Sequence, residues 1–312
     1  MNDTAEAVLS DSRPVGRFAP TPSGPLHFGS LIAATASYLN AKSQGGEWRL
    51  RIDDIDAPRV VPGACESIVR TLQAYGFEWD GDEVYQSERL ALYQSALADL
   101  NQSGRVYVCE CSRKMIQQRN SARPGQNDPR YDNFCRPQAV RPDVAAMTPA
   151  SAWRFAVTPG DIAFHDAILG AQRLDIASDL GDFVVKRADG FMGYHLACAV
   201  DDWDMGVTEV VRGADLLHSS FPQLAILQAL GVSDQAWPHY AHHPLVTNAE
   251  GIKLSKKSRA PAIQQADAVD TLHAALRFLQ HPPPKNLTRL TRLWDWAMKH
   301  WELSRLRTST VD

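Results

Sequence analysis

Residues 17–30, with the sequence Arg-Phe-Ala-Pro-Thr-Pro-Ser-Gly-Pro-Leu-His-Phe-Gly-Ser, constrain the fold of this chain more than any other segment. An apolar stretch that ends at Phe18 runs into a loop with prolines and a glycine. Residues 27–30 then open an apolar run with three-to-four spacing that continues to Leu39. This order predicts a strand, a tight loop and a helix N-terminus, where backbone N–H groups and the helix dipole favour phosphate.

A second segment, residues 253–257, is a polar loop with the sequence Lys-Leu-Ser-Lys-Lys. Its lysines can bring positive charge to a phosphate that the first segment holds. Taken alone, each segment has an ordinary explanation: a strand–turn–helix with a buried histidine, and a solvated basic loop. Their occurrence in this order in one chain favours a nucleotide site made from both.

The pattern around these segments predicts an α/β fold. Residues 48–56 alternate apolar and charged side chains, as a half-buried strand does, and they follow the first helix directly. Residues 15–56 therefore form a βαβ unit, which predicts a parallel sheet. Further strands are expected at residues 106–108, 153–157, 183–185, 194–200 and 209–211. Further helices are expected around residues 68–72, 90–100, 221–230, 262–279 and 287–306.

Residues 112–150 change character, because Arg, Pro, Asn and Gln dominate there without a clear period. They predict an inserted, irregular subdomain. Three of the five cysteines, Cys109, Cys111 and Cys135, lie at its start or within it. An odd number of cysteines in a long chain without a secretion signal argues against a disulfide scaffold. From the residues alone, a zinc site and a group of buried thiols explain these cysteines equally well.

Composition, charge and the N-terminal sequence argue against a membrane-spanning protein, a secreted protein and a strongly basic protein. With 312 residues, of which 44% are hydrophobic, the chain can form a substantial core. No apolar run approaches the roughly 18 residues of a membrane helix. Residues 1–14 lack a signal-peptide pattern and predict a disordered leader in a cytoplasmic protein. The net charge of −4 gives no overall attraction for nucleic acid, but Lys and Arg exceed the acids locally in residues 113–141 and 285–307.

The two segments resemble the nucleotide-binding signature of class I aminoacyl-tRNA synthetases. Residues 27–30 stand where that class has His-Ile-Gly-His, and residues 253–257 stand where it has Lys-Met-Ser-Lys-Ser. The Arg-Phe-Ala-Pro-Thr-Pro-Ser-Gly lead-in narrows the resemblance to the glutamyl branch, which residues 189–194 and 211–215 also resemble. The resemblance implies a Rossmann-like catalytic domain that activates L-glutamate with ATP and Mg²⁺, with the ligands at the carboxyl ends of the strands.

The resemblance also implies roles for individual residues. The catalytic set, which would stabilise charge on the phosphates, is His27, Ser30, Lys253 and Lys256. The ATP-binding set is Pro20, Gly24, His27, Gly29, Ser30 and Lys256. The glutamate-binding set is Arg17, Phe18, Ala19, Pro20, Thr21, Asp53, Tyr194 and Arg212. The chain departs from the family at Asp53, where the family has a glutamate that contacts the substrate.

A metal site is implied in the same way. The branch that this chain resembles carries Cys-x-Cys followed by Tyr-x-x-x-Cys, which matches Cys109, Cys111, Tyr131 and Cys135. The resemblance therefore favours one structural zinc ion with these ligands over three buried thiols.

The resemblance ends soon after the lysine segment, where full glutamyl-tRNA synthetases continue into anticodon-binding domains. Only residues 258–312 follow, close to the lower size limit of an independent domain, which is roughly 50 residues. The expected organisation is a leader at 1–14, two halves of the catalytic domain at 15–108 and 151–257, a zinc-binding insert at 109–150 and a helical extension at 258–312.

This organisation resembles the glutamyl-queuosine tRNA(Asp) synthetases, which are stand-alone relatives of the glutamyl-tRNA synthetase catalytic domain. The family implies activation of glutamate without tRNA, followed by transfer to queuosine in the anticodon loop of tRNA(Asp). We expect a monomer that binds ATP, L-glutamate and queuosine-bearing tRNA(Asp), and no membrane. The alternatives are a truncated glutamyl-tRNA ligase that charges a 3′ end, a nucleotidyltransferase of the same superfamily, and a non-catalytic nucleotide-binding regulator.

Overall fold

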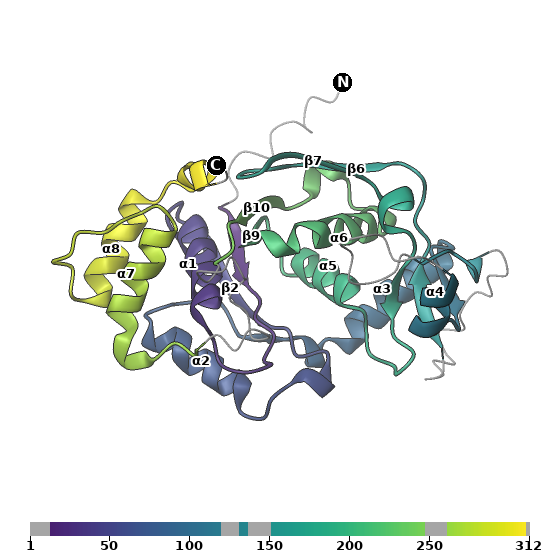
Figure 1. The fold of residues 1–312 in the computed structure, drawn as a ribbon, viewed down its shortest axis with the longest axis horizontal. Helices are drawn as coiled ribbons and strands as arrows, with labels where there is room; N and C mark the ends of the chain where they lie inside the picture. Colours follow the sequence, from purple (N-terminus) through teal and green to yellow (C-terminus); the bar gives the residue numbers. More distant parts are fainter. Residues whose placement is uncertain (1–12, 120–130, 137–150, 247–260, 310–312) are drawn as a thin grey trace, which may run out of the picture.

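A seven-stranded sheet crosses the middle of the molecule in the computed structural model, which describes residues 13–119, 131–136, 151–246 and 261–309 (Figure 1). The strand order is β3-β2-β1-β9-β10-β6-β7, and every neighbouring pair is parallel except β6 and β7. The strands are β1 (Val15–Phe18), β2 (Glu47–Ile52), β3 (Val84–Tyr85), β6 (Asp161–Asp166), β7 (Gly170–Asp175), β9 (Glu209–Gly213) and β10 (His239–His243). The predicted α/β fold with a parallel-dominated sheet is confirmed.

A smaller antiparallel sheet has the order β4-β5-β8, with β4 (Val106–Cys109), β5 (Ala152–Phe155) and β8 (Phe183–Lys186). This sheet and the short helix α4 (Arg113–Arg119) lie at one end of the molecule (Figure 1). The C-terminal helices α7 (Ala268–Phe278) and α8 (Leu290–His300) lie at the other end. Because β4 is an edge strand that ends at Cys109, the segment predicted to form an insert begins at the edge of the small sheet.

Helix α1 (Phe28–Lys42) joins β1 to β2, so the predicted βαβ unit is confirmed. The other long helices are α2 (Ala64–Ala74), α3 (Leu90–Gln102), α5 (Tyr194–Asp204) and α6 (Leu217–Ala229). Short helical turns occur at Ala57–Arg59, Gln86–Glu88, Ile176–Leu180, Ala214–Leu216, Asp234–Ala236, Gln265–Asp267 and Leu303–Ser309. Within the described residues, no helix combines the length and the apolar character needed to cross a membrane.

One predicted strand is wrong, because residues 194–200 form the first part of helix α5. Residues 196–200 are buried at every position, so they show neither the alternation of a strand nor the period of a half-exposed helix. Periodicity alone cannot assign such a short apolar run. The strand expected at residues 48–56 is also shorter, since β2 ends at Ile52. The sequence pattern does not predict the β6–β7 hairpin, β10, or helix α4 within the insert.

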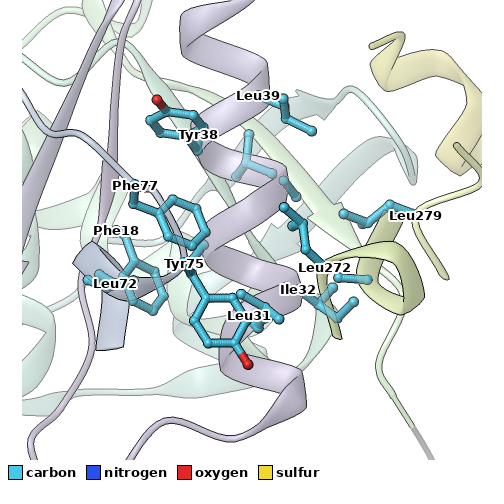
Figure 2. Packing of buried hydrophobic residues seen from close by; sticks show 14 of the residues in the cluster. Phe18, Leu31, Ile32, Tyr38, Leu39, Leu72, Tyr75, Phe77, Leu272 and Leu279 are labelled. Atoms are coloured by element: carbon cyan, nitrogen blue, oxygen red, sulfur yellow. The ribbon is translucent and has the colours of Figure 1, made fainter. Parts of the chain in front are cut away.

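Helix α1 lies at the centre of a large apolar core that also includes the C-terminal helices. Leu31 of α1 and Leu272 of α7 belong to this core (Figure 2). The ring of Tyr38, also on α1, lies edge-on to Phe77 and Trp294, with ring centroids 5.3 and 4.9 Å apart. The predicted C-terminal helical extension is therefore confirmed, and it shares a core with the seven-stranded sheet.

Candidate active site

A cleft of about 290 Å³ opens at the carboxyl ends of β1, β2, β9 and β10. Ligand sites in open parallel sheets lie at this edge. Most of the residues predicted for the site line it: Arg17, Phe18, Ala19, Pro20, Thr21, His27, Gly29, Ser30, Asp53, Tyr194 and Arg212. The fold therefore brings the residues predicted for ATP and for glutamate into one cleft.

The loop between β1 and α1 places His27 at the start of the helix. His27 is the N-cap residue of α1, and its Nδ1 accepts a hydrogen bond from the backbone N–H of Ser30 at 3.3 Å. Because Nδ1 is an acceptor, Nε2 carries the proton in the neutral imidazole. A backbone hydrogen bond of 3.0 Å from Asp53 to Pro20 fixes the loop to the end of β2. This end of α1 offers backbone N–H groups and the positive pole of the helix dipole to the cleft.

Of the residues predicted for the nucleotide site, Gly24 does not line the cleft and two lysines lie outside the described residues. Gly24 is not a lining residue, and its φ of +134° is a conformation that favours glycine. Lys253 and Lys256 lie outside the described residues. On either side of them, Val246 lines the cleft and Ala262 forms an isolated antiparallel bridge with His27. The described residues that precede and follow the lysine segment in the chain therefore lie at the site.

A buried network of ion pairs supports the cleft. Arg17 donates from Nε and Nη2 to the two carboxylate oxygens of Asp202, at 3.2 and 3.3 Å. Arg51 bridges two acids, with Nη1 at 2.6 Å from Asp202 and Nε at 2.7 Å from Asp53. All four side chains are buried. Burial opposes the ionisation of Asp202, but Arg17 and Arg51 hold the pKa of this carboxyl below its usual value.

Asp53, which departs from the family pattern, is part of the cleft wall despite its shorter side chain. Arg51 donates to its Oδ1, and the thiol of Cys198 on α5 lies 3.6 Å from its Oδ2. Burial raises the pKa of Asp53, although Arg51 acts in the opposite direction. A cation bound beside this carboxyl would favour its ionised form.

Arg212, on β9, differs from the other two arginines of the cleft because its partners are neutral. Its Nε donates to Nε2 of His242 at 3.0 Å, Nη1 to Oε1 of Gln223 at 3.1 Å and Nη2 to Oγ of Ser220 at 2.8 Å. Burial lowers the pKa of His242, which favours the uncharged ring. Among the described residues, Arg212 takes part in no ion pair, although only 5% of its surface is exposed. A buried guanidinium of this kind is suited to bind a ligand carboxylate.

Sequence reasoning missed several residues of the site. Arg51, Cys198 and His243 also line the cleft, whereas Asp202 and His242 lie behind it and hold the arginines. Arg51 and Asp202 could have been recognised from the sequence, because each is a charged residue within or beside an apolar segment. Charged side chains in such positions are paired or functional when they are buried.

The three predicted thiol ligands come together where the insert begins. The Sγ atoms of Cys109, Cys111 and Cys135 all lie within 4.8 Å of one another. The hydroxyl of Tyr131 is 3.4 Å from Sγ of Cys109 and accepts the backbone N–H of Cys135 at 2.8 Å. Arg119 donates to Sγ of Cys111 at 2.9 Å, but burial outweighs this contact and raises the pKa of the Cys111 thiol. This cluster can hold a metal ion, because soft sulfur donors at this spacing suit a tetrahedral cation.

The fold and the cleft define a class I tRNA synthetase catalytic domain. The sequence model of the family described as "tRNA synthetases class I (E and Q), catalytic domain" matches residues 15–280. The crystal structure of glutamate-tRNA synthetase from Elizabethkingia anophelis is similar, with a TM-score of 0.76 and 25% sequence identity. The similarity covers 96% of this chain and 67% of that one.

Relatives at higher identity narrow the assignment. A glutamyl-Q tRNA(Asp) synthetase from Chromobacterium violaceum is 51% identical, over 93% of this chain and 94% of its own length. One from Neisseria meningitidis serogroup C (strain 053442) is 46% identical, over 95% of this chain and 98% of its own length. The chain belongs to the glutamyl-Q tRNA(Asp) synthetase family, which confirms the resemblance seen in its sequence.

Proposed function

We propose that this chain activates L-glutamate with ATP and transfers the glutamyl group to queuosine in the anticodon loop of tRNA(Asp). Family membership supports the reaction, since relatives of that name match nearly the whole chain. One observation in the cleft supports an acidic amino acid as the substrate: the buried guanidinium of Arg212 has only neutral partners. A substrate carboxylate would supply the negative charge that the protein does not.

In this proposal the cleft binds the charged groups of glutamate. Arg212 pairs with one of the substrate's carboxylates, and Asp53 accepts a hydrogen bond from its ammonium group. Tyr194 contributes a neutral hydroxyl, because burial raises its pKa. Arg17 shares its charge with Asp202 and is therefore a weaker anion site than Arg212. The β1 side of the pocket is completed by Phe18, Ala19, Pro20 and Thr21.

The nucleotide would lie at the N-terminus of α1. A carboxylate oxygen of glutamate attacks the α-phosphorus of ATP, the bond from the α-phosphorus to the bridging oxygen breaks, and pyrophosphate leaves. Mg²⁺ bound with ATP would neutralise part of the phosphate charge. His27, Ser30 and the backbone at Gly29 would stabilise the charge that develops on the phosphate oxygens. Lys253 and Lys256 would add positive charge to the same oxygens. In the second step a queuosine hydroxyl attacks the glutamyl carbonyl and AMP leaves.

Activation is tested by ATP–pyrophosphate exchange with each amino acid in turn, without tRNA. We expect exchange with glutamate, because the described cleft contains residues for both substrates. Aspartate is the competitor to watch, since one methylene changes binding by only about 1–3 kcal/mol. Exchange that needs tRNA would support the truncated glutamyl-tRNA ligase instead, and no exchange with any amino acid would support the non-catalytic regulator.

Transfer is tested with two preparations of tRNA(Asp), one with queuosine and one from cells unable to make it. We expect labelled glutamate only on the first preparation. Removal of the 3′-terminal adenosine should leave that label in place, because the acceptor lies in the anticodon loop. Labelling of queuosine-free tRNA would overturn this acceptor and restore the ligase that charges a 3′ end.

We further propose that the chain works as a monomer in the cytoplasm, where its tRNA substrate is found. The local excess of Lys and Arg in residues 113–141 and 285–307 would contact tRNA phosphates. Binding through such contacts weakens steeply as the salt concentration rises.

The proposed metal is one structural zinc ion, held by the three thiols with Tyr131 as the fourth ligand. Metal analysis should find about one zinc per chain in protein purified under reducing conditions without chelator. Chelation should loosen the insert, measured by limited proteolysis, before glutamate-dependent exchange is lost. Cys135→Ser should lose the zinc, and Cys65→Ser, which changes a cysteine outside the cluster, should keep it. Zinc-free wild-type protein with an ordered insert would leave three buried thiols as the explanation.

A further inference from the structure

The contacts behind Arg212 continue to a buried acid that has no part in the proposed reaction. His242, on β10, accepts from Arg212 at Nε2, and its Nδ1 lies 2.6 Å from Oδ2 of Asp166. His242 and Asp166 are both 0% exposed. Asp166 is the last residue of β6, next to β10 in the sheet. A continuous chain of polar contacts therefore connects the β6–β7 hairpin to the cleft.

The arginine determines which nitrogen of His242 carries the proton. A guanidinium has no acceptor, so its contact with Nε2 is a hydrogen bond only if Nε2 is unprotonated. The proton of the neutral ring then lies on Nδ1, where Oδ2 of Asp166 accepts it. Burial lowers the pKa of His242 and keeps the ring neutral, although the bond with Asp166 acts in the opposite direction.

Asp166 is itself held in one orientation. Its Oδ1 accepts the backbone N–H groups of Ile168, Leu169 and His242, at 3.0, 2.9 and 3.2 Å. This leaves Oδ2 for the imidazole of His242. Burial opposes the ionisation of Asp166, but the bonds from His242 and the backbone hold its pKa below the usual value. Asp166 is therefore a fixed, ionised anchor for the ring.

The same contacts determine how Arg212 meets a ligand. Its Nε is bound by His242, and each terminal nitrogen gives one N–H to helix α6, at Gln223 and Ser220. Of the five N–H groups of a guanidinium, one on each terminal nitrogen is not used by these contacts. Such a pair can bind both oxygens of one carboxylate if the plane of the guanidinium is correctly oriented. The bond to His242 is the contact that fixes this plane from the side of β10.

We propose that His242 and Asp166 are positioning residues, which orient the guanidinium of Arg212 so that it binds one carboxylate of the amino-acid substrate with two hydrogen bonds. The identity of that substrate rests on the proposed function. On this view the β6–β7 hairpin takes part in selecting an acidic amino acid, although no residue of β6 or β7 lines the cleft. The two positioning residues affect the affinity for the substrate, because neither His242 nor Asp166 touches the reacting atoms.

The kinetic test compares KM values for the two substrates in ATP–pyrophosphate exchange. His242→Ala should raise the KM for glutamate roughly ten- to hundredfold and change the KM for ATP less than about twofold. His242→Gln should recover most of the loss, since its amide oxygen can accept the same bond from Arg212. Asp166→Asn, which keeps the size but not the charge of the anchor, should raise the KM for glutamate by a smaller factor.

His273→Gln is the matched control, because His273 is a buried histidine on α7 that bonds to the backbone oxygen of Leu287 at 2.7 Å. It should leave the KM for glutamate unchanged. If His242→Ala does not fold, Asp166→Asn carries the kinetic test. Equal rises in both KM values, or an unchanged KM for glutamate in His242→Ala and in Asp166→Asn, would overturn the inference.

A spectroscopic measurement separates this inference from the proposed function. In protein labelled with ¹⁵N-histidine, the signals of His242 are identified by their absence from the His242→Gln spectrum. They should show a protonated Nδ1 and an unprotonated Nε2 at neutral pH. The opposite tautomer, or an imidazolium, would overturn the inference whichever amino acid is activated. The expected tautomer in a protein without glutamate-dependent exchange would count against the proposed function alone.

Discussion

Replacing Asp202 with alanine is expected to lower the free energy of unfolding by about 3–5 kcal/mol, because two buried arginines lose the carboxylate that they share. Arg17 and Arg51 both donate to Asp202, and all three side chains are almost completely buried. An uncompensated charge in such a place cannot recover its hydration without opening the core. Urea denaturation at neutral pH, followed by tryptophan fluorescence, measures the change.

The pH dependence of stability gives an independent check on the same carboxylate. The pKa of Asp202 in the folded protein is below that of the unfolded chain, which is about 3.9. Its contribution to stability is therefore complete above the unfolded-state value and is lost as the pH falls through the folded-state value. Asp202→Asn removes the charge but keeps the shape, so its unfolding free energy should fall less steeply in acid than that of the wild type.

Asp204→Ala is the control for both measurements. Asp204 lies on the same helix and pairs with Arg89, but its side chain is 49% exposed. Loss of an exposed ion pair should cost less than about 1 kcal/mol. Asp202→Ala and Asp204→Ala variants of equal stability would show that the buried network does not depend on Asp202.

Much of the site could be predicted from the sequence because its signals are local. The β1–loop–α1 segment has prolines, a glycine and a helix start at fixed offsets, and the structure places His27 at the N-cap of α1. Arg212 could be predicted as a glutamate-binding residue because residues 211–215 together resemble the glutamyl branch of the synthetases. The sheet followed from the βαβ pattern, in which β1, α1 and β2 are consecutive.

The residues behind the cleft could not be predicted in this way, because their partners are distant in the sequence. Asp166 and His242 are 76 positions apart, and only the pairing of β6 with β10 brings them together. Asp202 meets Arg51 because α5 packs beside the sheet, and the sequence pattern had assigned the start of α5 to a strand. Long-range contacts between buried polar groups leave no periodic signal in the chain.

Replacing Arg212 with alanine is expected to reduce kcat/KM for glutamate by roughly 30-fold to several thousandfold, corresponding to about 2–5 kcal/mol. The reason is the charge of Arg212, which no ion pair balances among the residues that the structure describes. The guanidinium is buried and has neutral partners, so a substrate carboxylate is the group that would neutralise it. The KM for ATP should change little, because His27 and the N-terminus of α1 are separate from these contacts.

The variant should still fold, which makes the kinetic result interpretable. Without the guanidinium, Oγ of Ser220 and Nε2 of His242, which are already 3.5 Å apart, can bond to each other. Arg212→Lys keeps a positive charge but loses the planar pair of donors, so its kcat/KM should lie between those of the wild type and Arg212→Ala. Arg173→Ala, which removes an exposed partner of Asp161, is the control and should match the wild type. An Arg212→Ala enzyme that keeps its selectivity for glutamate would mean that the carboxylate is bound elsewhere, and Arg17 would then be the next residue to test, because it also lines the cleft.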